Sequence, residues 1–420
     1  MHRQSATADR APVEPQLGDF VHAARAANSA TGALQIALDT LCEKLEAHSA
    51  VVYQRENGSF SAVATYPPNH PAPGLPENGF LASRFRFYSA ALPISAEDLD
   101  SWQRWAADQK PEHLAELGNL KQLDVRFAAP LRGTNEIIGL LLLGPSTATS
   151  LHNWPHMLAL MLENTRLTAR VLEQEKINRD LALAAEVQKR LLPEGYPESS
   201  AADLAAFTLP ARSVGGDYYD FLRVGPDSLG IALADVAGKG IPAALIMSVV
   251  QASLRILATE SHMPLPELVA KLNRFLHRST GVSSYATFFY AQLNETTREL
   301  RYVNAGHNPP VLVRLRAHEN NLEELATGGM IIGMFSQAQY QEAQLVLEPG
   351  DVLVAFTDGV TEALNDAEEE FGEERLKALL CRLAHLPVHE MARHISAELK
   401  QWIGTAPQHD DLTFLILKVR

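Results

Sequence analysis

Aspartates at four places in the C-terminal half of this sequence have neighbours that suit a metal centre. They are Asp217 in VGGDYYDF, Asp235 in GIALADVAGKG, Asp358 in DVLVAFTDG, and Asp410 with Asp411 in HDDLTFLILKV. Three of the four places lie at the end of an apolar stretch that is typical of a buried strand. A carboxylate in such a place loses hydration, and an unpaired buried charge is costly.

A bound cation is the simplest way to offset these charges. Lys239 and Arg212 lie nearby in the sequence, but two basic side chains cannot neutralise five acids. Hard divalent cations prefer oxygen ligands, so carboxylates and waters favour Mg²⁺ or Mn²⁺. Zinc and calcium are disfavoured, because no Cys/His pair has zinc-ligand spacing and no DxDxDG run is present.

Each aspartate also has an ordinary structural interpretation, since an Asp after a strand commonly forms a turn or caps a helix. Asp235 could begin the turn before a helix at Pro242, and Asp358 could cap the VTEAL segment. The repetition of the strand-then-Asp arrangement favours the metal interpretation. Glycines also flank the acids, as a close approach of backbone or ligand requires: Gly216, Gly238, Gly240 and Gly359.

The motifs around these acids resemble those of a known enzyme family. In chain order they are VGGDYYDF, ALADVAGKGIPAAL, YVNAGHNPP, LEPGDVLVAFTDGVTEA and HDDLTF, preceded by EVQKRLLPE. Over roughly residues 180–420 the sequence is similar to the bacterial metal-dependent (PPM-type) serine/threonine protein phosphatases, in the branch of sporulation stage II protein E. The resemblance implies an α-β-β-α sandwich of two antiparallel sheets flanked by helices, with two Mn²⁺ or Mg²⁺ ions at one end.

The resemblance also implies a role for each acid. The groups that would hold the two ions are Asp217, Asp235, the Val236 carbonyl, Asp358 and Asp410, with Asp411 as the alternative register of the HDD run. Asp235 would bridge the ions, and Asp358 and Asp410 would complete one of them. Asp217 would hold the second ion, through waters. Asp235 and Asp358 would therefore be catalytic through the bound metals, which activate a water to attack the phosphorus of phosphoserine or phosphothreonine.

Four other residues near these motifs carry weaker expectations. Asp220, three residues after Asp217, is a lesser candidate ligand. Arg212 is the candidate for the arginine with which larger relatives grip phosphate. His307 in NAGHNPP is expected to be structural rather than a proton donor. Cys381 lies in the helical stretch KALLCRL, not in a phosphate-cradling CxxxxxR loop.

The elements that must position these residues predict a phosphatase domain over residues 196–420. Helices are predicted over 242–258 and 266–277, each with proline at its first turn, and over 373–384 and 388–402. Strands are predicted over 229–235, 286–293, 299–304, 310–315, 343–347, 351–356 and 412–418. Strands with hairpin spacing between helices favour packed antiparallel sheets.

A long helix is predicted over residues 156–192, which contain no Gly or Pro, with a stop at Pro193. Residues 166–195 are interpreted as a linker helix that transmits a signal. A heptad register through Leu167, Val171, Gln174, Asn178, Leu181, Ala185, Gln188 and Leu192 is apolar at five of its eight places. This predicts a homodimer that pairs through residues 160–192, with packing against the chain's own domains as the alternative.

The first part of the chain divides into a loose tail over residues 1–16 and an α+β domain over residues 17–165. The domain's order of helix, hairpin, loop-rich segment, hairpin and helix is similar to a GAF sensor domain. The segment 66–126 carries aromatic side chains that could line a ligand cavity or form core: Phe80, Phe85, Phe87, Tyr88, Trp102 and Trp105. The sequence leaves open an unknown small ligand and a pure protein-interaction role. Cys42, on an apolar helix face, is expected in the core.

Composition limits the partners and the location. The chain of 420 residues has 36 Lys and Arg against 50 Asp and Glu, a net charge of −14, which argues against nucleic-acid binding. The apolar stretch 137–143 is far short of the roughly 20 residues that span a bilayer, so no membrane segment is expected. Two cysteines in different predicted domains form no disulfide framework, and a cytoplasmic location is expected.

These observations together predict a metal-dependent protein phosphatase controlled by a GAF-like sensor. The expected substrate is a phosphorylated regulatory protein of the anti-sigma factor antagonist type. Two alternatives remain open: a catalytically inactive docking scaffold in a partner-switching pathway, and a metal-dependent nucleotide hydrolase. Gly238-Lys239-Gly240 superficially suggests a phosphate loop, but the GxxxxGK[ST] pattern is missing.

Overall fold

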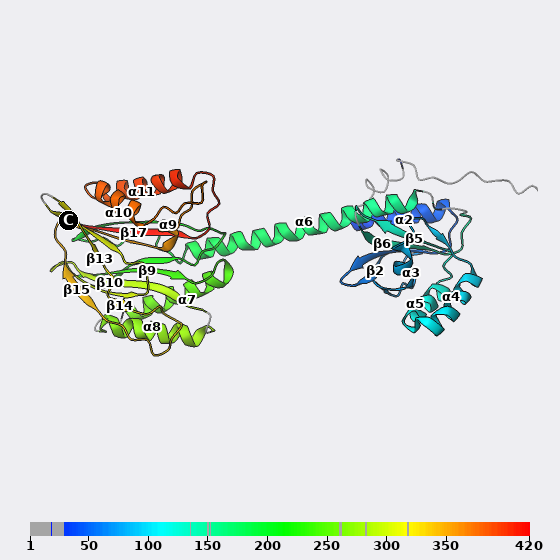
Figure 1. Cartoon of the computed structure of the whole chain (residues 1–420), viewed down its shortest axis with the longest axis horizontal. Coiled ribbons are helices and arrows are strands. Elements are labelled where there is room, and N and C mark those ends of the chain that lie inside the picture. Colours follow the sequence, from blue (N-terminus) through cyan, green and yellow to red (C-terminus); the bar gives the residue numbers. More distant parts are fainter. Residues whose placement is uncertain are drawn as a thin grey trace, which may run out of the picture. The chain divides into compact units, whose positions relative to one another are not determined.

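A computed structural model describes Gly18 and residues 29–134, 136–148, 151, 153–259, 263–281, 284–316 and 319–420. The chain divides into two compact units, Met1–Lys176 and Ile177–Arg420, and each is described here by itself (Figure 1). The predicted tail over residues 1–16 lies outside the described residues.

Unit 1 contains a six-stranded antiparallel sheet with the order β3-β2-β1-β6-β5-β4. Its strands are β1 (Ala50–Glu56), β2 (Ser59–Tyr66), β3 (Leu75–Pro76), β4 (Leu92–Pro93), β5 (Phe127–Arg132) and β6 (Ile137–Leu143). Both predicted hairpins, β1-β2 and β5-β6, are present. Asn57 and Gly58 connect β1 to β2 with φ angles of 45° and 83°, a left-handed turn that glycine and asparagine tolerate.

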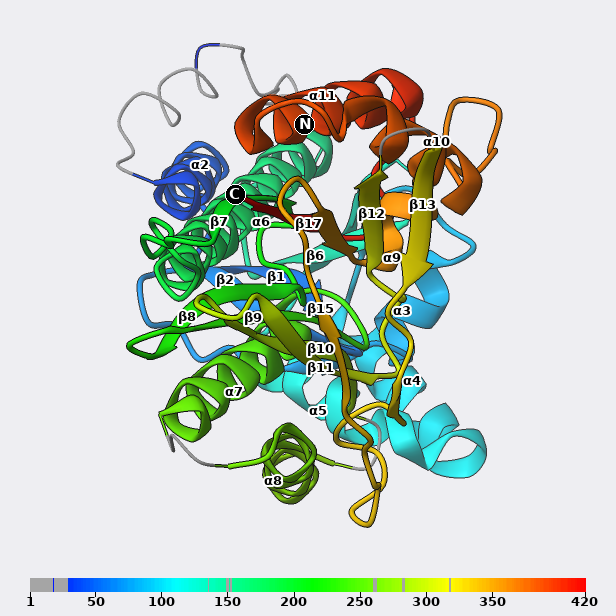
Figure 2. The same ribbon diagram turned by 90° about the vertical axis from the view of Figure 1, so that its left-hand side faces the viewer.

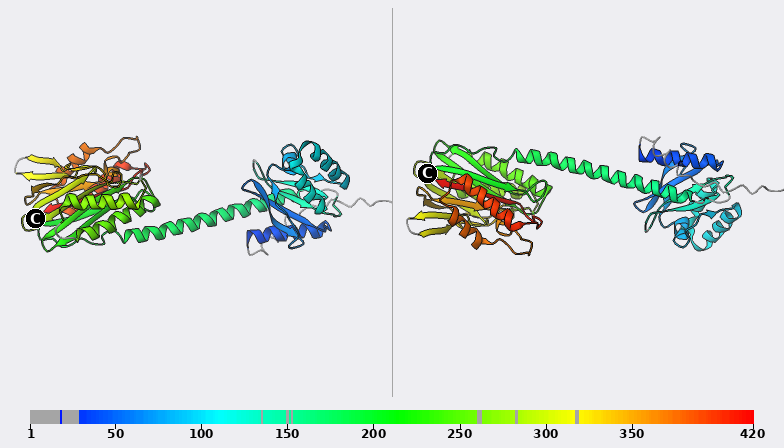
Figure 3. Two further views of the ribbon diagram at one scale, coloured as in Figure 1. Left: turned by 90° about the horizontal axis from the view of Figure 1, so that it is seen from below. Right: turned by 90° about the horizontal axis from the view of Figure 1, so that it is seen from above.

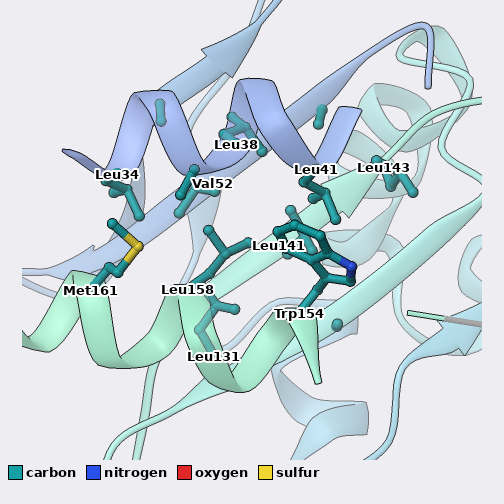
Figure 4. Packing of buried hydrophobic residues seen from close by; sticks show 14 of the residues in the cluster. Leu34, Leu38, Leu41, Val52, Leu131, Leu141, Leu143, Trp154, Leu158 and Met161 are labelled. Atoms are coloured by element: carbon teal, nitrogen blue, oxygen red, sulfur yellow. The ribbon is translucent and has the colours of Figure 1, made fainter. Parts of the chain in front are cut away.

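Helices cover both faces of this sheet. On one face, α2 (Ala30–Lys44) and the first turns of α6 (Trp154–Lys189) bury Leu38, Leu41, Trp154 and Leu158 in one core (Figure 4). Ser29 begins α2, and its hydroxyl accepts a hydrogen bond from the Gly32 amide at 3.0 Å.

The other face of the sheet corrects the expectation of a loop-rich segment. It is covered by α3 (Phe80–Phe85), α4 (Ala96–Gln109) and α5 (Leu114–Gln122). α3 and α5 are short, with six and nine residues, and α4 is mostly polar, so no apolar periodicity stood out. Three of the six aromatic residues expected around a cavity, Phe80, Phe85 and Trp102, pack in or against this core, with the Phe80 and Trp102 ring centroids 5.0 Å apart. The other three, Phe87, Tyr88 and Trp105, are exposed. Cys42 is buried in the core of the first face, as predicted.

Unit 2 is a sandwich of two sheets, as predicted. One sheet has the order β14-β11-β10-β9-β8, with β15 also on β11, and the other has the order β13-β12-β16-β17-β7. The strands are β7 (Ala202–Leu209), β8 (Tyr218–Gly225), β9 (Ser228–Val236), β10 (Ala286–Asn294), β11 (Glu299–Ala305), β12 (Val311–Arg316), β13 (Glu319–Glu324), β14 (Gly328–Gly329), β15 (Ala343–Val346), β16 (Val352–Phe356) and β17 (Leu412–Val419). All pairings are antiparallel except that of β14 with β11. The predicted strands are present, while β7, β8, β13 and β14 were not predicted.

Three apolar layers hold the sandwich together. The middle layer lies between the sheets and includes Leu233, Phe289 and Leu415. On the outer face of the first sheet lie α7 (Ile241–Ala258) and α8 (Leu265–Ser279), and on that of the second lie α10 (Glu373–Leu383) and α11 (Val388–Ile403) (Figure 2). The short helix α9 (Asp358–Thr361) follows β16. These helices match the predicted ones within a few residues.

Two helices bear on the predictions of a linker and of no membrane segment. The 36 residues of α6 form one unbroken helix in every view (Figure 3). Among the described residues, α7 is long and apolar enough by length and composition to cross a membrane. One face of α7, with Met247, Val250 and Leu254, is nevertheless buried in the core that it shares with α8 and the first sheet. Such a face is typical of a core helix in a globular domain.

Candidate metal centre and active site

The candidate aspartates lie at strand ends, at one end of each sheet in unit 2. Asp235 is the second-last residue of β9, and Asp217 immediately precedes β8, which pairs with β9. In the other sheet, Asp358 follows β16 closely, and Asp410 and Asp411 precede β17, which pairs with β16. In antiparallel neighbours the end of one strand lies beside the start of the next, so the acids of each sheet lie at the same end of that sheet.

A hydrogen bond from Thr357 connects these ends of the two sheets. The Thr357 hydroxyl donates to Asp217 Oδ2 over 2.9 Å, and the Asp217 side chain is buried. The other oxygen, Asp217 Oδ1, is buried without a hydrogen-bond partner among the residues that the structure describes. Burial, followed by the nearby charge of Asp235, raises the pKa of Asp217 well above its usual range. A buried carboxylate oxygen without a donor is a suitable ligand for a cation.

Asp411 is occupied by backbone amides. Its Oδ1 accepts from the Ala211 amide at 2.7 Å, and its Oδ2 accepts from the Gly216 amide at 2.5 Å. A Cβ at Gly215 would lie 2.5 Å from Asp411 Oδ2, so glycine is required where this loop meets the carboxylate. The structure therefore places Asp411 as the residue that holds the loop before Asp217, with both of its oxygens in use.

Asp410 faces the opposite way, toward the turn after β9. Lys239 Nζ lies 2.8 Å from Asp410 Oδ2, and the Lys239 side chain is 41% exposed. Lys239 stands between Gly238 and Gly240, whose φ angles of 96° and 76° form a left-handed turn that projects it. The carboxylate of Asp410 thus has a surface ammonium partner where Asp411 has buried amides.

The remaining carboxylates repel one another. Burial and then the charges of Asp358, Asp410 and Asp411 raise the pKa of Asp235 to about 7, against the opposing effect of Lys239. Burial and the charge of Asp410 likewise raise the pKa of Asp358. These effects indicate that the carboxylates of Asp235, Asp358 and Asp410 lie within electrostatic range of one another.

The Val236 carbonyl lies beside the Gly216 segment. A Cβ on Gly216 would lie 3.0 Å from Val236 O and 3.2 Å from the Ala243 Cβ. The Val236 carbonyl oxygen therefore lies beside the loop that carries Asp217. The absence of a side chain at Gly216 allows this approach.

The donor set fits a hard divalent cation in chemistry and in charge. All of the candidate ligand atoms are oxygens, and five carboxylates far exceed the single charge of Lys239. Among the residues that the structure describes, however, no three His, Cys, Asp or Glu side chains are gathered closely enough to hold one ion. Mutual repulsion of the carboxylates is a sufficient physical reason for side chains that stand apart.

Asp220, the lesser candidate, is not brought to this group. Its alternation along β8 places it with Tyr218 on the face toward α7, opposite to Asp217. The Tyr218 hydroxyl and Arg255 Nε each donate to Asp220 Oδ2 over 2.8 Å. Asp220 is 1% exposed, so this network fixes α7 to the sheet rather than holding a metal.

Replacing Arg255 with Met should lower the free energy of unfolding by about 2 kcal/mol, because the buried Asp220 carboxylate loses its countercharge. The figure is reduced for the partial exposure of Arg255. Urea unfolding measures the change. Adding Asp220→Asn to Arg255→Met should restore most of the loss, and an unchanged midpoint in the single variant would contradict the role of the ion pair.

His307 lies at the same end of the first sheet, within the protein. It is 4% exposed, and its Nδ1 lies 2.7 Å from the Thr287 hydroxyl. Thr287 is on β10, where it pairs with Asp235 of β9. Asn304 fixes the turn, since its side chain accepts from the His307 amide at 2.7 Å and donates to the His307 carbonyl at 2.9 Å. Burial lowers the pKa of His307 to about 4. This neutral, enclosed imidazole has the surroundings of a structural residue.

The contribution of His307 to the stability of unit 2 should therefore fall as the pH drops from about 6.5 to about 4, because the imidazole binds a proton at a higher pH in the unfolded chain than it does when buried. The contribution of this group is at most about 3 kcal/mol, at about 1.4 kcal/mol per pH unit. Free energies of unfolding of the wild type and His307→Asn at several pH values measure it. The difference between the two proteins should narrow toward acid pH; a constant difference would show that His307 does not titrate in this way.

Sequence reasoning missed two polar residues that support the acids, Thr357 and Gln188, and named a third, Arg212, only as the candidate contact to phosphate. Thr357 and Gln188 had no signal beyond their motifs, because each acts through a contact distant in sequence. Gln188 forms two hydrogen bonds with the backbone of Gly215, at 2.7 and 3.0 Å. Arg212 lies at the rim, where its Nη1 would be 3.6 Å from a Cβ on Gly240. That position is compatible with the predicted contact to phosphate.

Comparison with known proteins places these features in a family. The model of the family "Stage II sporulation protein E (SpoIIE)" matches residues 225–420. The phosphoserine phosphatase RsbU of Bacillus subtilis is 32% identical over 248 residues, which make up 58% of this chain and 71% of RsbU. The phosphoserine phosphatase RsbP of the same organism is 26% identical over 254 residues, and the chain spans 60% of its length.

A solved structure supports the fold of unit 2. The PP2C domain of SiaA from Pseudomonas aeruginosa superposes with a TM-score of 0.51 and 23% sequence identity. The superposition covers 59% of this chain and 98% of that domain. At this level of identity the likeness concerns the fold alone.

Proposed function

Because this chain belongs to the family of serine phosphatases that contains RsbU, we propose that it hydrolyses phosphoserine or phosphothreonine on a regulatory protein of the anti-sigma factor antagonist type. The observation that carries the proposal is the meeting of acids from distant segments at one end of the sandwich, where burial and the charges of three other carboxylates raise the pKa of Asp235. Such a group has no structural advantage unless cations join it.

Two Mn²⁺ or Mg²⁺ ions are the cofactors that this proposal requires. Asp235, Asp358 and Asp410 would hold one ion, and Asp217 with Asp235 and the Val236 carbonyl would hold the other. Bound ions of this kind lower the pKa of a water and neutralise phosphate oxygens. Asp411 and Thr357 would keep Asp217 in place, because their hydrogen bonds fix its loop and its Oδ2. Arg212 and Lys239 would attract the substrate's phosphate at the rim.

The assignment of Asp410 rather than Asp411 as the ligand rests on their hydrogen bonds. Both oxygens of Asp411 accept backbone amides at 2.5–2.7 Å, which leaves fewer lone pairs for an ion. Asp410 Oδ1 accepts a single amide, that of Asp411 at 2.8 Å, and its Oδ2 has a surface lysine as its charge partner, which an ion could displace at small cost.

A comparison of substrates tests the proposed activity. The whole chain is incubated with a kinase-phosphorylated regulator of this type, with a nucleoside triphosphate and with p-nitrophenyl phosphate, in Mn²⁺ and in EDTA. The proposal expects release of phosphate from the phosphoprotein in Mn²⁺ and none in EDTA. Release from the nucleotide alone would support a nucleotide hydrolase. A chain that binds no Mn²⁺ in calorimetry would be the docking scaffold.

We propose that unit 1 is a GAF-like sensor and that α6 carries its signal and pairs two chains. A sheet covered by helices on both faces supports the first part. Exposed apolar side chains along α6 support the second: Leu160, Leu167, Val171, Leu172, Ile177, Leu183 and Val187. Sedimentation of the whole chain tests the dimer, and a cytoplasmic location is part of the same proposal.

A further inference from the structure

The last turn of α6 is bonded to the loop that carries Asp217. Gln188 Nε2 donates to the Gly215 carbonyl over 2.7 Å, and the Gly215 amide donates to Gln188 Oε1 over 3.0 Å. One carboxamide therefore satisfies both polar groups of one peptide residue. Such a pair fixes distance and orientation together, as a single hydrogen bond does not.

The loop is held from its other side by Asp411. The Gly216 amide donates to Asp411 Oδ2 at 2.5 Å, and the amide of Asp217 lies 3.4 Å from the same oxygen. Gly215 is thus enclosed between Gln188 and Asp411, with no room for a Cβ. The position of Asp217 depends on the hydrogen bonds from both residues, and one of them, Gln188, belongs to α6.

The end of α6 is itself fixed within unit 2. The buried Gln251 of α7 donates to the Leu191 carbonyl over 3.3 Å. Leu192 packs against the middle core and against the core under α7. The segment after α6 is therefore ordered and cannot compensate for a movement of the helix. A displacement of α6 is transmitted to the Gly215 loop through Gln188.

We propose that Gln188 is a positioning residue, which holds the segment from Gly215 to Asp217 in the geometry in which Asp217 serves its ion. The position of the last turn of α6 then sets the affinity of that ion. This inference rests on the proposed metal-dependent function. It adds a route from the linker helix to the metal centre that passes through one side chain and one peptide group.

Gln188→Met tests the inference, because Met keeps the length and helix propensity of Gln and removes both hydrogen bonds. Glu186→Gln is the matched control on the same helix; it removes only the surface ion pair with Arg190. Calorimetric titration of the whole chain with Mn²⁺ should show roughly tenfold weaker binding of one ion in Gln188→Met, the scale of two lost hydrogen bonds. Glu186→Gln should bind like the wild type.

Four further measurements separate positioning from a general loss of structure. The urea unfolding of Gln188→Met should remain a single transition, with its midpoint lowered by no more than the loss of two hydrogen bonds, while hydrogen exchange should speed up most in the peptide over residues 211–217. Phosphatase activity should recover at saturating Mn²⁺. In an Asp217→Asn background the effect of Gln188→Met on Mn²⁺ affinity should disappear, as coupled residues require.

Unchanged Mn²⁺ affinity in Gln188→Met, with an active wild type, would overturn the inference and leave the proposed function intact. A wild-type chain that neither binds Mn²⁺ nor releases phosphate would overturn the proposed function and the inference with it. An equal loss of affinity in the Asp217→Asn background would show that Gln188 acts elsewhere, and the inference would be wrong.

Discussion

Replacing either Asp235 or Asp358 with Asn should reduce Mn²⁺-dependent release of phosphate from a phosphoserine protein by at least about a thousandfold. Asparagine keeps the shape of the side chain but removes the charge that would hold the ions. Burial and then the charges of three other carboxylates raise the pKa of Asp235 to about 7, so a neutral side chain relieves both the desolvation and the repulsion. The metal-free variants should therefore be as stable as the wild type, or more so.

Loss of activity without loss of stability is the pattern that distinguishes a metal ligand from a residue of the fold. The rate of phosphate release at several Mn²⁺ concentrations and the urea midpoint without metal give the two measurements. Asp227→Asn is the control, since Asp227 is exposed in the turn between β8 and β9. Full activity in both the Asp235 and the Asp358 variant would exclude the proposed metal centre.

Gly359→Ala should disrupt both the stability and the activity of unit 2. A Cβ on Gly359 would lie 2.1 Å from the Asp411 carbonyl oxygen and 3.4 Å from the Asp410 Cβ. Backbone cannot yield to such a contact as a flexible side chain can, so the start of β17 must shift. We expect a loss of about 3 kcal/mol in the free energy of unfolding, by analogy with overpacked cores. Phosphatase activity should fall by at least about a hundredfold, since displacements near 1 Å are costly in active sites.

Gly195→Ala provides the comparison for this prediction. Gly195 has no neighbouring atom within 4 Å of a built Cβ. Its substitution should leave the urea midpoint and the phosphatase rate unchanged. If Gly359→Ala behaves in the same way, the start of β17 is free to move and the close packing around Asp410 and Asp411 is not required.

The parts of the fold that could be predicted are those with a strong local pattern. Proline at the first turn and apolar spacing identified α7 and α8, and the absence of Gly and Pro identified α6. Segments with a weak local pattern were missed: β7 and β13 alternate weakly, and α3 has only six residues. Their formation depends on pairing or burial against distant parts of the chain, which local periodicity does not contain.

The candidate site was predictable in its acids and not in its supports. The strand-then-Asp pattern located Asp235 and Asp358, and the neighbouring charges that raise their pKa values agree with a shared site. The different surroundings of Asp410 and Asp411 could not be predicted, because only the folded loop brings the Gly216 amide to Asp411. Asp220 had the residue type of a ligand, but strand alternation turns it away.

The pairing of β7 with β17 has a consequence for how unit 2 is made. Ala202 lies opposite Val419 and Leu209 opposite Leu412, so partners in this ladder are separated by about two hundred residues. During synthesis, β7 must wait for the ribosome to complete residue 419 before its edge is covered. A chain truncated before residue 410 would lack β17 and Asp410, so β7 would be left without its partner strand and the candidate site would be incomplete. Such an exposed strand promotes aggregation.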